Sequence, residues 1–248
     1  MGAETNQYAP DLVYDNHYIE ASNSTDTSYH LTEGLTNQAI SFIHDLRSAA
    51  PSRPFFMYFC PGACHAPHQA PRAYIDRYRG HFDQGWDAWR EATYHRQLEM
   101  GILPPGTELS PRPEWVKAWD SLSDDEQKLF ARMMQCFAGF LTHVDEHIGR
   151  LVAVLEAVGE LENTVIVLVS DNGASGEGGE IGSFNENVFF NGVPESLELN
   201  LQHYDELGGP HAYNHFPTGW TMAGNTPFKR WKRNTHNGGI ADPCIVQW

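Results

Sequence analysis

The chain has 248 residues, and 16 Lys and Arg against 32 Asp and Glu give a formal net charge of −16 at neutral pH. This acidity excludes a general nucleic-acid-binding surface, and 41% hydrophobic with 12% aromatic residues excludes a disordered chain. The sequence contains no apolar run of about 18 residues, so it predicts no membrane span. Residues 1–10 lack a secretory signal pattern, and the four cysteines form no C-x-x-C pair. We expect the cysteines to be reduced and mostly buried. The sequence leaves the compartment open and slightly favours a soluble cytoplasmic protein.

The first half of the chain alternates apolar runs with turn residues. Residues 10–18 favour a short strand, and residues 31–47 place apolar side chains at helical spacing, with Thr32 near the start of the helix. Residues 54–60 are a near-continuous apolar run between prolines, which is typical of a strand buried on both faces. The Pro- and Trp-rich residues 72–122 follow. We expect them to run over the surface rather than through the core.

The second half contains the clearest helix pattern. Ser123 and Glu126 form a capping box, and apolar residues then repeat at three and four positions as far as Val158. Residues 164–169 are a β-branched run that predicts a second buried strand, and a last strand starts at Cys244, just before the sequence stops. Strand, helix and strand in this order predict a βαβ crossover. The expected class is therefore α/β, with a partial doubly wound, mostly parallel sheet flanked by helices.

Three features near predicted strand ends carry the residue types of an anion-binding site. His65 lies in a proline-braced turn after the first buried strand, and Asp171 and Asn172 follow the second. Carboxylate and amide oxygens are the ligands that Ca²⁺ and Mg²⁺ prefer. Lys232 belongs to a basic cluster, residues 229–233, in an otherwise acidic chain. Each feature alone also fits a plain turn or a solvated charge run, but together they indicate chemistry on an anion assisted by a divalent cation.

Three other motifs have simpler structural explanations. His143, Glu146 and His147 fit the H-x-x-E-H pattern of one zinc peptidase class, but a half-exposed helix flank explains them as well. The glycine-rich residues 176–182 lack the Lys of a phosphate loop, and their two glutamates would repel phosphate, so a mobile loop is expected. Cys64 is expected to pack rather than to act as a nucleophile paired with the next residue, because neighbouring side chains on an extended segment point apart.

Four stretches resemble the large arylsulfatases of the sulfatase family, within the alkaline-phosphatase superfamily. In family order and approximate spacing, they are residues 54–67, 145–150, 163–173 and 232–240. The resemblance implies that His65 and Lys232 are the catalytic, sulfate-binding residues of this chain. It also implies that Asp171 and Asn172 are ligands of a divalent cation, Ca²⁺ in most of the family, with Mg²⁺ as the alternative. The implied substrate is a small-molecule sulfate ester, attacked by a formylglycine made from a cysteine or serine in C/S-x-P-x-R.

That nucleophile motif is missing from the 248 residues. No cysteine leads it, and the nearest serine sequence, Ser52-Arg-Pro54-Phe-Phe56, has Phe where Arg is required. The family's paired aspartates on its first strand have no counterpart either. We therefore expect residues 1–248 to be an internal part of a sulfatase catalytic domain that is inactive in isolation. The expected function of the full-length protein is sulfuric ester hydrolysis. The alternatives are a phosphate or phosphonate ester hydrolase of the same superfamily, or a non-catalytic anion-binding remnant.

Overall fold

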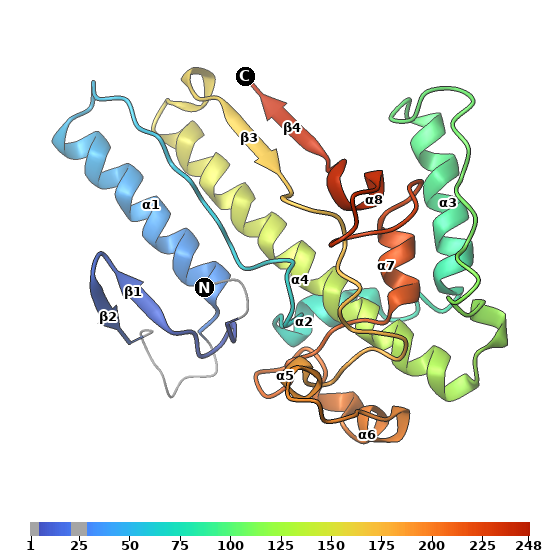
Figure 1. Ribbon diagram of the computed structural model, residues 1–248. Coiled ribbons are helices and arrows are strands. Elements are labelled where there is room, and N and C mark those ends of the chain that lie inside the picture. Colours follow the sequence, from blue (N-terminus) through green and yellow to red (C-terminus); the bar gives the residue numbers. More distant parts are fainter. Residues whose placement is uncertain (1–4, 21–28) are drawn as a thin grey trace.

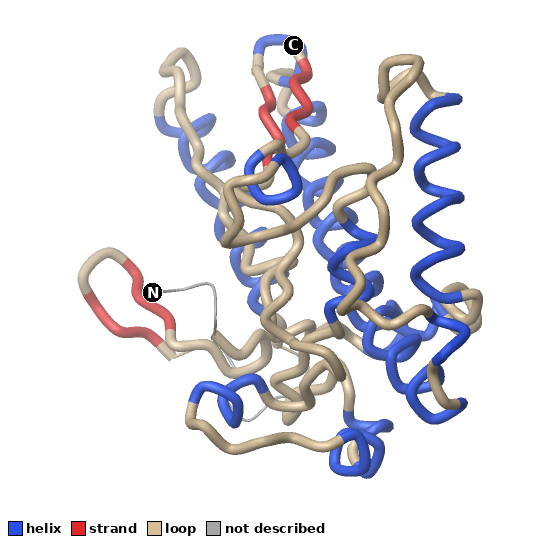
Figure 2. Tube along the Cα trace, turned by 45° about the vertical axis from the view of Figure 1, so that its right-hand side comes forward, coloured by secondary structure: helices blue, strands red, loops and turns tan. Residues whose placement is uncertain are grey.

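The computed structural model describes residues 5–20 and 29–248. A long helix, α4, crosses the middle of the molecule, with α1 on one side and α3 and α7 on the other (Figure 1). Short strands occupy a small part of the chain, and long loops connect the helices (Figure 2). The elements in chain order are β1 (Leu12–Tyr14), β2 (His17–Ile19), α1 (Leu31–Ala49), α2 (Arg72–Ile75), η1 (Asp76–Tyr78), α3 (Gly85–Glu99), η2 (Trp119–Ser121), α4 (Asp124–Ala157), η3 (Leu161–Asn163), β3 (Ile166–Val169), α5 (Glu186–Phe190), α6 (Leu197–Gln202), η4 (Tyr204–Glu206), α7 (Thr218–Gly224), α8 (Asn237–Ile240) and β4 (Cys244–Gln247).

Helix α4 begins and ends where the sequence predicts. The Ser123 hydroxyl accepts a hydrogen bond from the Glu126 backbone N–H at 3.3 Å, and the Glu126 carboxylate accepts one from the Ser123 N–H at 2.8 Å. This capping box satisfies two otherwise unpaired donors. The helix ends just before Gly159, whose φ of +76° suits glycine and ends a right-handed helix. None of the helices in the described part of the chain is long and apolar enough to cross a membrane.

The main hydrophobic cluster lies on the first half of α4 and includes three packed tryptophans. The ring centre of Trp86, on α3, lies 4.8 Å from that of Trp119 and 5.9 Å from that of Trp220. Residues 72–122 therefore enter the core, contrary to the prediction. Their buried side chains in this cluster are Ile75, Phe82, Trp86, Val116, Trp119 and Leu122. Single aromatic residues in irregular segments bury a large area without leaving a periodic pattern in the sequence.

A smaller cluster joins α1 to the second half of α4. Its buried members are Ala39, Ile43, Leu151 and Leu155. Residues 54–60 run along this cluster without belonging to a strand. Their partly buried side chains on the cluster are Phe55, Met57 and Phe59. Phe56 and Tyr58 point the other way and are 91% and 84% exposed. The predicted strand buried on both faces is therefore wrong: the apolar run is covered on one face, and no strand pairs with it among the described residues.

The strands in the described residues form two antiparallel pairs. β1 pairs with β2, and β3 pairs with β4 in a register that sets Ile166 opposite Gln247 and Val169 opposite Cys244. The α/β class holds, but the predicted mostly parallel sheet is not formed by these strands. β4 runs back along β3, and strand direction depends on this long-range pairing rather than on the composition of either strand.

Candidate functional site

The turn after residues 54–60 presents His65. Its backbone N–H donates to the Gly62 carbonyl at 3.0 Å, and its Nδ1 lies 2.9 Å from the carbonyl oxygen of Ala66. Because a carbonyl oxygen can only accept, Nδ1 carries the proton. In the neutral imidazole, Nε2 is then a lone-pair acceptor. The turn thus fixes both the orientation and the tautomer of this histidine.

Lys232 meets His65 across a separation of 167 residues. Its Nζ lies 2.9 Å from His65 Nε2, and its side chain is 21% exposed. The Lys232 backbone N–H donates to the Ala174 carbonyl at 3.1 Å, which ties the lysine to the loop that follows β3. Two of the residues selected from sequence therefore lie in direct contact, with the lysine Nζ facing the imidazole Nε2.

Glu177 completes this group, although its loop was expected to be mobile and unsuited to an anion site. Its Oε2 accepts hydrogen bonds from Lys232 Nζ and from Ser175 Oγ, each at 2.9 Å. Partial burial acts to raise the pKa of Glu177, but the hydrogen bonds from Lys232 and Ser175 and the lysine charge hold it below its ordinary value. The carboxylate is thus ionised beside Lys232. Its sequence context, a glycine-rich stretch without periodicity, carried no signal for this contact.

An asparagine holds the two loops of the site together. Asn225 Oδ1 accepts from the Ala174 N–H at 3.0 Å, and its Nδ2 donates to the Arg230 carbonyl at 3.3 Å. Beside it the backbones cross closely, because a Cβ on Gly173 would lie 1.8 Å from the carbonyl oxygen of Gly238. A side chain at position 173 is therefore excluded by the crossing. These contacts fix the loop after β3 relative to the loop that carries Lys232.

Two histidines are buried behind the site. The His68 and His215 rings lie 4.8 Å apart, and both are shielded from solvent. Burial lowers the pKa of His215 to about 4, and burial, with a smaller effect of the nearby His215 and His65 imidazoles, lowers that of His68 well below its ordinary value. Both are therefore neutral near pH 7. His215 is close enough to Glu177, His65 and Lys232 for these groups to affect its pKa, so uncharged imidazoles are buried near the site.

Asp171 and Asn172 follow β3, as predicted, but this strand is largely exposed and the prediction that it is buried is wrong. Asn172 Nδ2 donates to Asp171 Oδ1 at 2.7 Å, and Asp171 is exposed. Partial burial, followed by the charge of Asp171, raises the pKa of Asp242 nearby. The described residues contain no group of three His, Cys, Asp or Glu side chains arranged to hold a metal ion. The donor type suits Ca²⁺ or Mg²⁺, but two residues supply fewer oxygens than the six to eight that Ca²⁺ takes.

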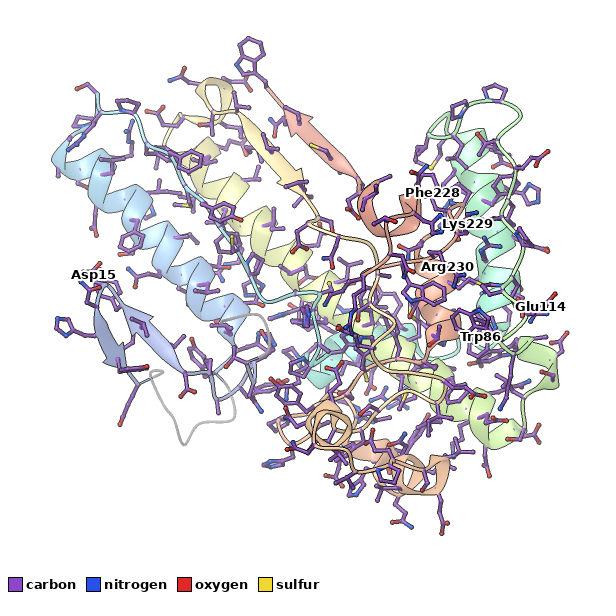
Figure 3. The ribbon with its side chains drawn as sticks, viewed as in Figure 1. Asp15, Trp86, Glu114, Phe228, Lys229 and Arg230 are labelled. Carbon is purple, nitrogen blue, oxygen red and sulfur yellow. The ribbon has the colours of Figure 1, made fainter. Side chains whose placement is uncertain are left out.

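Of the other basic residues near Lys232, Arg233 lies beside Glu177, whereas Lys229 and Arg230 make different contacts. Phe228, Lys229 and Arg230 lie together on the loop between α7 and α8 (Figure 3). The Arg230 guanidinium lies 6.0 Å from the ring centre of Trp115, and Lys229 is exposed. Lys232 is thus the member of this cluster whose contact with His65 the structure establishes.

The H-x-x-E-H motif does not form a zinc site among the described residues. His143 and His147 are buried on α4, and His147 Nδ1 is hydrogen-bonded to the His143 carbonyl at 2.9 Å. Glu146 faces solvent, accepting from the Tyr74 hydroxyl at 2.6 Å and from Arg77 at 2.5 Å. The carboxylate that would serve as base is therefore engaged by Tyr74 and Arg77.

A histidine and a lysine brought together, with an exposed Asp-Asn pair on the neighbouring loop, are residue types that suit binding of an anionic group. The sequence model of the sulfatase family matches residues 2–248, and the chain belongs to the sulfatase family. The family has an alkaline-phosphatase-like α/β fold.

Relatives that are named sulfatase or arylsulfatase agree with this assignment. An uncharacterized sulfatase of Schizosaccharomyces pombe is 29% identical over 211 residues, covering 85% of this chain and 37% of the relative. An arylsulfatase of Klebsiella aerogenes is 28% identical over 224 residues, covering 90% of this chain and 46% of the relative. An arylsulfatase of Clostridium perfringens is 27% identical over 148 residues. The chain therefore spans less than half the length of each of the first two.

Proposed function

We propose that residues 1–248 form part of one catalytic domain and carry the sulfate-binding part of a sulfuric ester hydrolase for a small-molecule sulfate ester. The observation that carries this proposal is the contact of Lys232 Nζ with His65 Nε2 at 2.9 Å. It brings a lysine donor and an imidazole together, next to the loop after β3 that contains Asp171 and Asn172. Donors placed before the reaction stabilise negative charge that develops on the oxygens of an ester group.

Asp171 and Asn172 are proposed as two ligands of a divalent cation, Ca²⁺ or Mg²⁺. When bound, the cation would act as a Lewis acid on an ester oxygen. The other ligands and the formylglycine nucleophile must come from polypeptide that this chain lacks, since no C/S-x-P-x-R sequence occurs in it. The contribution of this chain's own residues is to bind and orient the anionic group. We therefore propose that the chain is inactive by itself.

Kinetics of a polypeptide that contains this chain together with a C/S-x-P-x-R segment would test the proposal. His65→Ala and Lys232→Ala should each lower kcat/KM for an aryl sulfate about a hundredfold, because each removes a polar group at the ester. Lys229→Ala is the matched control, since it removes a lysine of the same loop that is exposed. Equal activity of all three variants would contradict the site. Faster turnover of the matching aryl phosphate would favour the phosphate ester alternative.

A further inference from the structure

The carboxylate of Glu177 is held in place from more than one side. Ser175 Oγ and Lys232 Nζ each donate to Oε2 at 2.9 Å, and Arg233 Nη1 lies 3.6 Å from Oε1. The Glu177 backbone N–H also donates to Ser175 Oγ at 3.2 Å. The side chain is 18% exposed, so little solvent competes for these contacts. Its position is determined by the loop rather than by chance contact with a surface lysine.

The donors of Lys232 can be counted. An ammonium group has three N–H donors and no acceptor. One faces His65 Nε2 and another faces Glu177 Oε2, both at 2.9 Å. His65 Nε2 acts as an acceptor here, because Nδ1 faces the Ala66 carbonyl. Two fixed acceptors leave one N–H of Lys232 with a defined direction.

We propose that Glu177 is a positioning residue that aims this third N–H of Lys232 at the ester group. The inference rests on the proposed function, since it assumes that Lys232 binds the ester anion. Glu177 does not itself touch the ester. A carboxylate beside an anion site repels the anion, so the change in anion affinity when Glu177 is removed distinguishes two roles. If Glu177 acts only as a counter-charge, its removal tightens anion binding; if it positions Lys232, its removal weakens binding.

The first test uses the 248-residue protein without any ligand. Nitrogen-15 NMR of the His65 imidazole reports whether Nε2 accepts a hydrogen bond. Glu177→Ala should move the Nε2 signal toward that of Lys232→Ala, because the lysine loses its anchor. Glu177→Gln should keep the wild-type signal, because its amide oxygen still accepts from Lys232. Glu180→Ala is the matched control on the same loop, where the carboxylate pairs with Lys117 instead. Wild-type His65 signals in Glu177→Ala would overturn the proposal.

The second test is calorimetric titration of the same proteins with inorganic sulfate. Glu177→Ala should bind sulfate about tenfold more weakly, the loss expected when one hydrogen bond to a charged group is removed. Glu177→Gln should stay within about twofold of wild type. Ser175→Ala should weaken binding in the same direction if Glu177→Ala fails to fold. Tighter binding by Glu177→Ala would overturn the positioning role. A wild-type chain that binds no sulfate would refute the anion site, while the NMR result would still decide whether Glu177 holds Lys232.

Discussion

The histidines of the failed zinc motif belong to a buried cluster that makes the fold sensitive to acid. The His143 ring lies 4.4 Å from the rings of both His30 and His147. Burial, helped by the neighbouring imidazoles, lowers the pKa of His143 to about 3 and that of His30 to about 4. Two contacts act in the opposite direction: the hydrogen bond to Gln69 raises the pKa of His30, and the charge of Glu146 raises the pKa of His143. Between these values and about 6.5, the ordinary histidine pKa, the unfolded chain binds more protons than the folded one.

Stability should therefore be fully present above about pH 6.5 and fall as the pH drops toward 4. Each buried histidine contributes up to about 1.4 kcal/mol per pH unit. His143→Phe keeps a ring among its aromatic neighbours but removes one titrating group, so its unfolding free energy should depend less steeply on pH. Urea unfolding at pH 7.5, 6 and 5 measures both slopes. Parallel slopes for the two proteins would show that His143 is not the group responsible.

At the scale of single elements, the start of α4 is the most sharply testable feature. Ser123→Ala removes the hydroxyl that accepts from the Glu126 N–H and should lower the unfolding free energy by about 1 kcal/mol. Ser41→Ala is a matched control, because Ser41 is exposed within α1 and alanine is the better helix former there. Urea unfolding of both variants gives the comparison. Equal stability of the two would mean that the capping box contributes nothing to the fold.

The elements also show which signals were readable in the sequence. α4 was predictable because its capping box and apolar stripe are local patterns. The pairing of β3 with β4 was not, since it depends on a partner about 80 positions away. The same distinction applies to the site. His65 and Lys232 were chosen from sequence context and from family resemblance, whereas Glu177 acquires its role from a contact with a residue 55 positions later. No local pattern encodes such a contact.

For the molecule as a whole, the largest departure from the buried strands that the sequence predicts is the exposed apolar surface around β3 and β4. Phe56 is 91% exposed and Trp248 95% exposed, and the strands themselves add further exposed apolar side chains, namely Val167, Leu168, Val169, Ile245 and Val246. Monomeric proteins rarely expose a contiguous apolar surface of this kind, and unpaired strand edges favour association.

The isolated chain is therefore expected to self-associate with rising concentration. Phe56→Lys combined with Val246→Lys should shift sedimentation velocity profiles toward the monomer, and the midpoint of urea unfolding should stay close to that of wild type. Ile102→Lys is the control, because Ile102 is also an exposed apolar residue but follows α3, away from these strands. Equal association of all three proteins would contradict a role for this surface.

The junction made by Asn225 has a consequence for how this chain can diversify. Asn225 is hydrogen-bonded to the backbone of both Ala174 and Arg230, so the two ends of the segment between Ala174 and Asn225 are held next to each other. Changes in length within the exposed residues 191–194, between α5 and α6, need not alter the spacing of Asp171 and Lys232. A loop whose two ends are fixed in this way can change in evolution, or by engineering, while the site residues next to its ends keep their geometry.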